Sequence, residues 1–177
     1  ANKKGADISA TSLGNTVKGL NRDVTIRDIV STYIYPNTLK TLCVTRAQLK
    51  CALERSAEYF AIDADGKLKV SESFLTPIEQ HFNYDYFLGI EAAFDIRRSV
   101  GDRVVSIKYK GEELSGDKRL TLCMNNYRAS GAGGYDIYRQ CQTVRELPAE
   151  IAELIIAYVD KHRNITVDKH KWLKLIY

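Results

Sequence analysis

The sequence predicts an α+β fold, organised as a single domain with a mixed β-sheet and about three to four helices. Segments with a helical spacing of apolar residues are interleaved with strand-like segments, several of which are joined by short glycine turns. The length of 177 residues fits one domain of ordinary size. Hydrophobic residues make up 45% of the chain and charged residues 27%, as in a typical globular protein with a sizeable core.

The chain is expected to open with a short strand and an amphipathic helix. Residues 6–12 (ADISATS) have the character of a short buried strand. From Ile26 onward, apolar residues recur at the spacing of one helical face. Thr25 is a favourable N-cap, Asp28 complements the first turn, and Pro36 ends the helix. The expected apolar face comprises Ile26, Ile29, Val30, Tyr33 and Ile34.

A second strand and a second helix follow. Residues 37–44 (NTLKTLCV) predict the strand. Thr45 is then a helix N-cap, and Gln48 three residues later completes a capping box. The expected apolar face of this helix comprises Leu49, Leu53, Ala57 and Phe60.

Residues 61–70 (AIDADGKLKV) predict a hairpin that turns at Asp65 and Gly66. The spacing of its aspartates is too short for an EF-hand loop, and no glutamate follows in register. A turn is therefore preferred to a calcium site.

The second half of the chain is expected to form three strands and a final helix. After an irregular, aromatic-rich stretch over residues 70–85, the strands are expected at residues 89–96, 102–114 with a turn near Gly111, and 118–127. Pro148 is a favoured first-turn residue and is expected to open the final helix. The apolar face of that helix would comprise Ile151, Leu154, Ile155, Tyr158 and Val159. The tail from Lys169 to Tyr177 is either a docked end or an exposed extension.

Charge and composition exclude several classes of protein. The net charge is only +4 and the basic residues are spread along the chain, which argues against a dedicated nucleic-acid-binding protein. The chain contains no run of about 18 apolar residues, so no transmembrane helix is predicted. The three histidines show no metal-ligand spacing. The four cysteines lack CxxC spacing and are interpreted first as small core residues, and second as a disulfide or metal set; they are Cys43, Cys51, Cys123 and Cys141.

The most distinctive stretch is NNYRASGAGGYDIY, residues 125–138. It lacks the G-K-[ST] of a phosphate-binding loop and the spacing of a dinucleotide fingerprint, and the chain contains no G-x-S-x-G motif. Five of the eleven tyrosines lie here or in the irregular stretch before residue 89. Stacking a nucleobase on such a ring contributes roughly 1–3 kcal/mol, and neighbouring glycines let the backbone approach a ligand. The alternative is that these tyrosines only fill the edge of the core.

Four segments carry a resemblance to a known family. They are ADISATS (6–12), VTIRDIVSTYIYPNTLKTLCVTRAQLKCALERSAEYF (24–60), FNYDYFLGIEAAFDI with GDRV (82–104), and MNNYRASGAGGYDIY (124–138). Together they resemble the C-terminal domain of the 5′-nucleotidase family, and most of all its 2′,3′-cyclic-nucleotide 2′-phosphodiesterase/3′-nucleotidase branch. The YPNTL and NNYRASG segments are the specific ones. The resemblance covers roughly residues 5–163.

The resemblance implies a two-domain parent protein. Its N-terminal metallophosphoesterase domain would hold two divalent metal ions through Asp, His and Asn ligands. Residues 1–177 would be the substrate domain, which recognises the nucleoside and stacks the base between two aromatic rings. The G-N-H-[DE] and H-x-H motifs are absent from this chain. We therefore expect no cofactor in this chain, no hydrolysis by the chain alone, and an extracellular, cell-wall or periplasmic parent.

The resemblance also implies the site. Tyr127 corresponds to the ring just before the glycine turn. Tyr84 is preferred for the second ring, and Phe87 remains the alternative. The residues expected to shape the pocket are Asn125, Asn126, Gly131, Gly133 and Tyr135.

Two departures from the 5′-nucleotidases affect the expected specificity. Gly133 stands where their G-G-D-G-[YF] turn has a ligand-contacting aspartate. Their N-G-G-x-R motif is replaced here by SLGNTVKG, residues 12–19, in which Ser12, Asn15 and Lys18 are the candidate replacements. A 5′-nucleotidase or UDP-sugar specificity is therefore disfavoured.

Three functions remain after the resemblance. The first is the nucleoside-recognition domain of a cyclic phosphodiesterase/3′-nucleotidase, with the metal domain of the same protein and a nucleotide as its partners. A domain of a 5′-nucleotidase with different specificity is a variant of it. The second is a non-catalytic nucleoside-binding module. The third, a single-stranded nucleic-acid-binding protein, is the weakest and predicts a steep salt dependence of binding.

Overall fold

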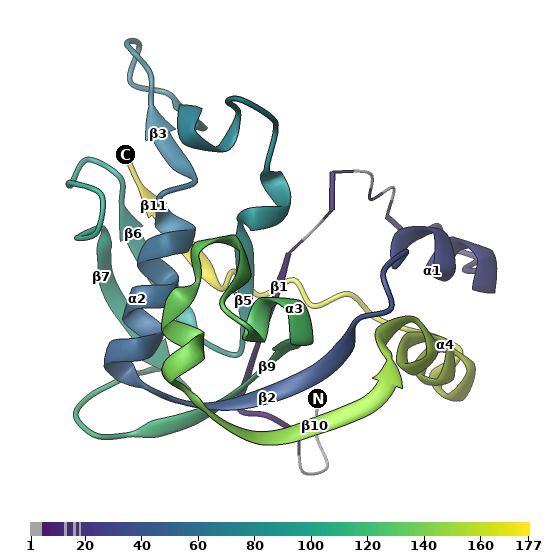
Figure 1. The fold of residues 1–177 in the computed structure, drawn as a ribbon. Helices are drawn as coiled ribbons and strands as arrows, with labels where there is room; N and C mark the ends of the chain where they lie inside the picture. The colour runs from purple at the N-terminus through teal and green to yellow at the C-terminus, as the bar shows by residue number, and fades with distance from the viewer. Residues whose placement is uncertain (1–4, 13, 16, 18) are drawn as a thin grey trace.

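The computed structural model describes residues 5–12, 14–15, 17 and 19–177, and it has the α+β architecture that the sequence predicts (Figure 1). The helices are α1 (Ile26–Thr32), α2 (Arg46–Ala57), α3 (Asn126–Ala129) and α4 (Ile151–His162). Short 3₁₀ turns are η1 (Glu72–Phe74), η2 (His81–Asn83), η3 (Ala132–Gly134) and η4 (Asp136–Gln140).

Two sheets and one hairpin hold the described strands. The first sheet has the order β10 (Gln142–Glu150), β2 (Thr38–Thr45), β9 (Arg119–Asn125), β1 (Ile8–Ser12) and β5 (Asp85–Leu88). The second has the order β11 (Leu173–Ile176), β6 (Glu91–Asp95), β7 (Val104–Tyr109) and β8 (Glu112–Glu113). The hairpin pairs β3 (Phe60–Ile62) with β4 (Leu68–Val70). Neighbouring strands are antiparallel, except that β1 is parallel to β9 and β11 to β6.

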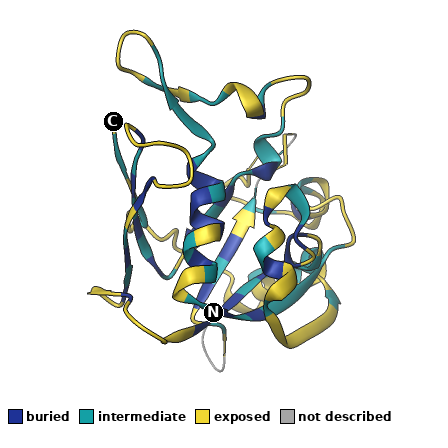
Figure 2. Cartoon of the chain, turned by 60° about the vertical axis from the view of Figure 1, so that its left-hand side comes forward, coloured by how far each residue is buried: buried dark blue, intermediate teal, exposed yellow. Residues whose placement is uncertain are grey.

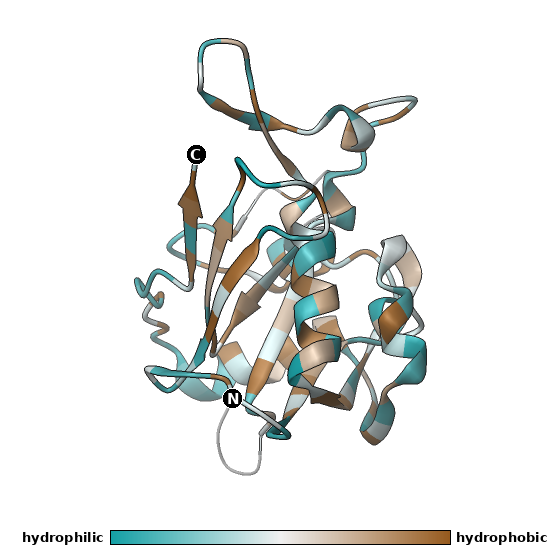
Figure 3. Cartoon of the chain, turned by 90° about the vertical axis from the view of Figure 1, so that its left-hand side faces the viewer, coloured by the Kyte–Doolittle hydropathy of each residue, from teal (hydrophilic) through white to brown (hydrophobic). Residues whose placement is uncertain are grey.

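The hydrophobic core lies between the two sheets and includes the buried face of α2 (Figure 2). Leu49, Leu53 and Ala57 are buried on that face, as predicted. Phe60 is not part of the helix, which ends at Ala57; it begins β3 and packs on the edge of the core. Figure 3 shows the hydrophobic residues gathered along the strands of the second sheet.

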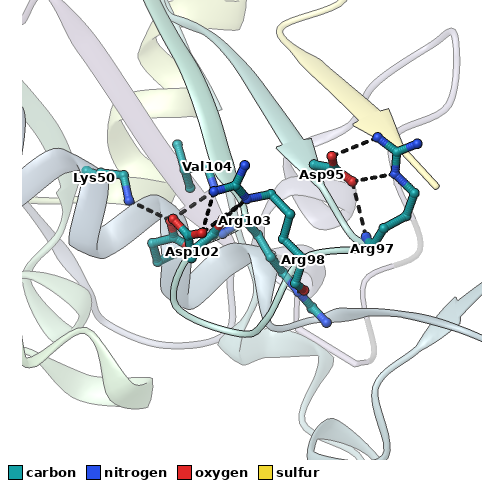
Figure 4. A network of polar contacts seen from close by, with 8 residues as sticks. Lys50, Asp95, Arg97, Arg98, Asp102, Arg103 and Val104 are labelled. Atoms are coloured by element: carbon teal, nitrogen blue, oxygen red, sulfur yellow. Dashed lines mark hydrogen bonds and ion pairs between the residues drawn. The ribbon is translucent and has the colours of Figure 1, made fainter.

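Glu54 fixes α2 against β7. Its carboxylate accepts hydrogen bonds from the backbone amides of Arg103 and Val104, at 2.9 Å each, and it pairs with the Lys50 ammonium group at 2.9 Å (Figure 4). The Arg103 guanidinium donates in turn to the carbonyls of Ala57 at 3.0 Å and Phe60 at 2.7 Å. Each buried charge in this contact is thereby paired or hydrogen-bonded, as burial requires.

The capping box predicted for α2 forms, and a second one forms at the start of α1, where Thr25 is the predicted N-cap. The Thr25 hydroxyl accepts from the Asp28 amide, and the Asp28 carboxylate accepts from the Thr25 amide at 2.8 Å. Thr45 and Gln48 make the same reciprocal pair at the start of α2. The sequence located both helix starts to the residue, because a capping box is a local interaction.

The apolar faces predicted for α1 and α4 are not part of the core. Of the face of α1 only Ile29 is buried, and α4 has no buried residue. The two helices instead contact each other at one end of the molecule (Figure 1). Periodicity identifies an apolar face but not the element it packs on, which is why the location of these faces was not predictable.

The C-terminal part of the structure corrects the predicted start of the last helix and shows where the tail lies. Pro148 does not open a helix; it lies in β10, and the helix begins at Ile151. Its position coincides with a register shift between Leu147 and Glu150, where a residue without an N–H is tolerated on an edge strand. The tail is a docked end, because Leu173–Ile176 pairs with β6.

The hairpin is confirmed, and the cysteines are free thiols. The Asp63 carboxylate accepts from the amides of Asp65 and Lys67, and Gly66 has a φ of 78°.

Cys51 is exposed on α2, so its interpretation as a core residue is wrong; the other three cysteines are partly buried. None of the described helices is long and apolar enough to cross a bilayer.

Candidate functional site

The candidate site is built on the chain that follows β9. The short helix α3 carries Tyr127, and the glycine turn, residues 131–135, comes directly after it. Both asparagines predicted for the pocket support this local structure. The Asn125 side chain caps α3 by accepting from the Arg128 amide at 2.6 Å, and the Asn126 side chain accepts from the Thr38 amide of β2 at 3.1 Å.

Tyr127 and Tyr84 differ in their surroundings. The Tyr127 side chain is 52% exposed. Tyr84 lies between η2 and β5 and is partly buried, with its ring centroid 4.7 Å from that of Tyr59 and 5.5 Å from that of Phe60. Burial raises the pKa of the Tyr84 hydroxyl, so it stays neutral and protonated. Tyr127 therefore offers an open ring face, and Tyr84 a ring that its aromatic neighbours hold in place.

Phe87 and Tyr135, which were also predicted, are both buried. Phe87 is 6% exposed within the core, and Tyr135 is 0% exposed. The Tyr135 hydroxyl lies 2.8 Å from the Ser56 hydroxyl and accepts from the Asp85 amide at 2.9 Å. Its ring stacks on Tyr138 with the centroids 5.6 Å apart. Of the two alternatives for the second ring, Tyr84 is thus the more accessible. The Tyr135 side chain anchors the glycine turn through the hydrogen bonds of its buried hydroxyl.

A buried ion pair lies beneath this surface, and the sequence analysis did not find it. The Arg128 Nε donates to the Asp85 carboxylate at 2.9 Å, and the two side chains are 3% and 1% exposed. Arg128 also donates to the carbonyl of Phe82 at 2.7 Å and to that of Ala132. One signal was available: Asp85 follows Tyr84 and Arg128 follows Tyr127 in the chain.

The interaction with Arg128 does not fully offset the free-energy cost of burying the Asp85 carboxylate. Burial raises the pKa of the Asp85 carboxyl to about 6, against the opposing effect of Arg128 and, more weakly, of Arg55. The second carboxylate oxygen, Oδ2, has no hydrogen-bond partner in the described structure. A buried carboxylate oxygen that no donor reaches favours the protonated form of the Asp85 carboxyl.

Gly133 is required by its neighbours as well as by its backbone. Its φ is 75°, and a Cβ at this position would overlap the Arg128 guanidinium and the Asn83 amide oxygen. Its carbonyl accepts from the Arg55 Nε at 3.0 Å. A side chain at position 133 would therefore require the Arg128 guanidinium to move. Gly131, with a φ of 90°, would likewise meet the Arg139 side chain.

Two described residues of the segment SLGNTVKG, Ser12 and Asn15, lie close to the same region. Ser12 is paired with Asp85 in the register of β1 and β5, and the Asn15 side chain donates to the Glu79 carbonyl at 2.9 Å. Lys18, the third candidate replacement in that loop, lies outside the described residues. No group of three or more His, Cys, Asp or Glu side chains among the described residues could hold a metal ion.

Comparison with known proteins establishes the family. Residues 1–140 match the family model described as "5′-nucleotidase, C-terminal domain". The chain belongs to this family. The match includes β1, α2 and the whole candidate site, from Tyr84 to the glycine turn.

Curated relatives agree with the branch that the resemblance indicated. A 2′,3′-cyclic-nucleotide 2′-phosphodiesterase/3′-nucleotidase of Haemophilus influenzae is 32% identical over 120 residues, covering 61% of this chain and 18% of that protein. The trifunctional nucleotide phosphoesterase protein YfkN of Bacillus subtilis is 23% identical over 155 residues, covering 81% of this chain and 10% of that protein.

Solved structures share the fold. A Staphylococcus aureus structure described as a 5′-nucleotidase has a TM-score of 0.90 at 37% identity, over 97% of this chain and 34% of that one. A 5′-nucleotidase precursor from Thermus thermophilus has a TM-score of 0.73 at 17% identity, over 96% of this chain and 31% of that one. The chain thus spans about a third or less of the length of the relatives it matches.

Proposed function

We propose that this chain is the nucleoside-recognition domain of a 2′,3′-cyclic-nucleotide 2′-phosphodiesterase/3′-nucleotidase, and that Tyr127 and Tyr84 stack the base. We call the space for the base between these two rings the tyrosine slot. The observation that carries the proposal is the half-exposed Tyr127 ring beside the glycine turn, joined to the segment of Tyr84 through the Arg128–Asp85 pair.

The chemistry of the slot suits a flat ligand. Both rings belong to tyrosines, and the hydroxyl of Tyr84 stays neutral because burial raises its pKa. A neutral aromatic face stacks on any nucleobase and contributes roughly 1–3 kcal/mol per base. The glycine turn adds backbone without side chains at Gly131, Gly133 and Gly134, all with positive φ, so a ligand edge can approach its peptide groups closely.

Hydrolysis is assigned to another domain of the parent protein. Two divalent metal ions held there would activate water for attack on the phosphoester. The described residues of this chain offer no cluster for a metal ion, so in this proposal their contribution is to bind and orient the nucleoside. The isolated chain is then inactive towards cyclic nucleotides. The proposed location of the parent protein is extracellular, in the cell wall or periplasmic; the description of the Thermus relative as a precursor supports export.

Titration with adenosine tests the slot. In calorimetry or NMR, Tyr127→Ala is expected to weaken binding by about tenfold, because the loss of one stacking face costs about 1.4 kcal/mol. Tyr177→Ala is the matched control, since Tyr177 is also exposed but follows β11 in the other sheet. Equal affinity of the Tyr127→Ala variant and the wild type would contradict the proposal.

A further inference from the structure

We infer that the Arg128–Asp85 pair is a positioning device that sets the separation and orientation of the two stacking tyrosines. The inference rests on the proposed function and adds two residues to its site, neither of which contacts the base. Its starting point is a coincidence of sequence and structure. Each member of the pair directly follows one of the rings, Asp85 after Tyr84 and Arg128 after Tyr127.

A direct ion pair between the residues that follow the two rings restricts how far the ring-bearing segments can move apart. The Arg128 Nε lies 2.9 Å from the Asp85 Oδ1, and the two side chains are 3% and 1% exposed. Each stacking residue is therefore one peptide unit away from a buried, charge-assisted hydrogen bond, which is shorter and stronger than a neutral one. Among the ion pairs of the described residues, this is the one in which both partners are almost inaccessible to solvent.

Arg128 joins three segments around the slot. Besides Asp85 in β5, its guanidinium donates to the carbonyl of Phe82 in η2 at 2.7 Å and to that of Ala132 in the glycine turn. The same group lies over the Tyr135 ring, with 4.5 Å between its central carbon and the ring centroid. A planar fork with donors in fixed directions can satisfy such a set, whereas the single ammonium group of a lysine cannot.

The glycine turn is shaped to admit this side chain. Gly133 has no room for a Cβ because the Arg128 guanidinium and the Asn83 side chain fill that space. From the other side, the Asp85 amide donates to the Tyr135 hydroxyl at 2.9 Å, so the turn is also tied to β5. Two contacts thus connect the segment of Tyr127 with that of Tyr84. One joins the Arg128 side chain to the Asp85 carboxylate, and the other joins the Asp85 amide to the Tyr135 hydroxyl.

Stability alone is a weak reason for such a pair. Removing two charges from water costs several kcal/mol per ion, and replacement of a buried pair by apolar residues of similar volume is often neutral or stabilising. The unpartnered Asp85 Oδ2 shows that the charge is not fully compensated here. A directional connection, in contrast, is something that apolar side chains cannot supply.

The double variant Asp85→Leu/Arg128→Met tests the inference, because it removes the direction of the contact but keeps apolar volume. Two properties are measured besides the unfolding midpoint in urea: amide hydrogen exchange over residues 126–134, and adenosine affinity. We expect a midpoint close to that of the wild type, exchange faster by about tenfold over this segment, and an adenosine Kd raised by about tenfold. Arg128→Lys, a milder change, should show the same pattern if the double variant does not fold.

The control is Asp95→Asn/Arg97→Gln, which removes a bidentate ion pair at the end of β6 whose arginine is exposed to solvent (Figure 4). Neither exchange over residues 126–134 nor adenosine affinity should change in it. Unchanged exchange and affinity in a folded Asp85→Leu/Arg128→Met variant would overturn the inference. If the wild-type chain does not bind adenosine, the proposed function fails in the isolated chain, while the exchange measurement still decides whether the pair orders this segment.

Discussion

At the scale of single residues, the candidate site lies over buried side chains that do not reach its surface. Arg128, Asp85 and Tyr135 are buried under the glycine turn, and each contacts at least one of the others. The exposed ring of Tyr127 is visible as a candidate in the sequence, because tyrosines beside glycines are a recognisable pattern. The buried partners are harder to find, because their places after Tyr84 and Tyr127 in the chain mark Asp85 and Arg128 as neighbours of the rings but do not say that they meet.

Gly133 allows a sharp test at this scale. Gly133 and Gly66 have nearly the same φ, 75° and 78°, but only Gly133 has atoms within contact of a Cβ. Gly66→Ala should lower the free energy of unfolding by about 1 kcal/mol, the cost of a left-handed backbone. Gly133→Ala should cost about 3 kcal/mol or more, because the Arg128–Asp85 pair must move apart. Equal losses in urea unfolding would show that the turn accommodates a side chain.

The titration of Asp85 gives a second prediction. The group faces the cations Arg128 and Arg55 and the hydroxyls of Tyr84, Tyr135 and Tyr138. Burial raises the pKa of its carboxyl from 3.8 to about 6, so the folded state binds more protons than the unfolded state between these values. The contribution of Asp85 to stability is therefore full below the lower pKa and is lost as the pH rises through the higher one.

The expected change is a decline in the free energy of unfolding on the order of 2 kcal/mol between about pH 4 and pH 7. Urea unfolding of the wild type and of Asp85→Asn over this range measures it. The variant carries a neutral side chain at every pH, so this decline should be missing from its pH profile. Parallel pH profiles for the two proteins would contradict the assignment.

At the scale of elements, helix starts were predictable and helix partners were not. Thr25 and Thr45 begin their helices with the same capping box, yet α2 lies in the core whereas α1 buries only Ile29. A cap is a contact between residues three apart, and the sequence specifies it completely. The partner of an apolar face is a long-range property. Pro148 shows the same limit, because a residue suited to a helix start is also tolerated on an edge strand.

The two caps should therefore differ in what they stabilise. Thr45→Ala is expected to lower the global free energy of unfolding by about 1 kcal/mol, because α2 unfolds with the core. Thr25→Ala, the matched change in α1, should have less than half of that global effect. It should instead speed amide exchange within residues 26–32, through local fraying of a helix that few contacts hold. A global loss as large as that of Thr45→Ala would show that α1 unfolds together with the core.

At the scale of the whole molecule, the first sheet brings the segments of the candidate site together. β1 lies between β9 and β5 in the first sheet, so the ends of two strands that are distant in the sequence approach the same place. Tyr127 follows β9 and Tyr84 precedes β5. The tail then completes the second sheet as β11, in parallel with β6. The sequence left the docking of this tail open, since pairing of a four-residue strand depends on the edge it meets.

The sequence alone determined the local features: the N-caps of α1 and α2, the hairpin at Gly66, most of the strands around the core, the aromatic and glycine-rich stretch, and the resemblance that the family match bears out. Each of these is specified within a few residues or by a continuous pattern. Only the tertiary structure decided that Arg128 pairs with Asp85, that this side chain excludes any residue larger than glycine at position 133, and that Phe87 and Tyr135 lie inside. Burial and ion pairing depend on which segments meet, and that is a property of the folded chain.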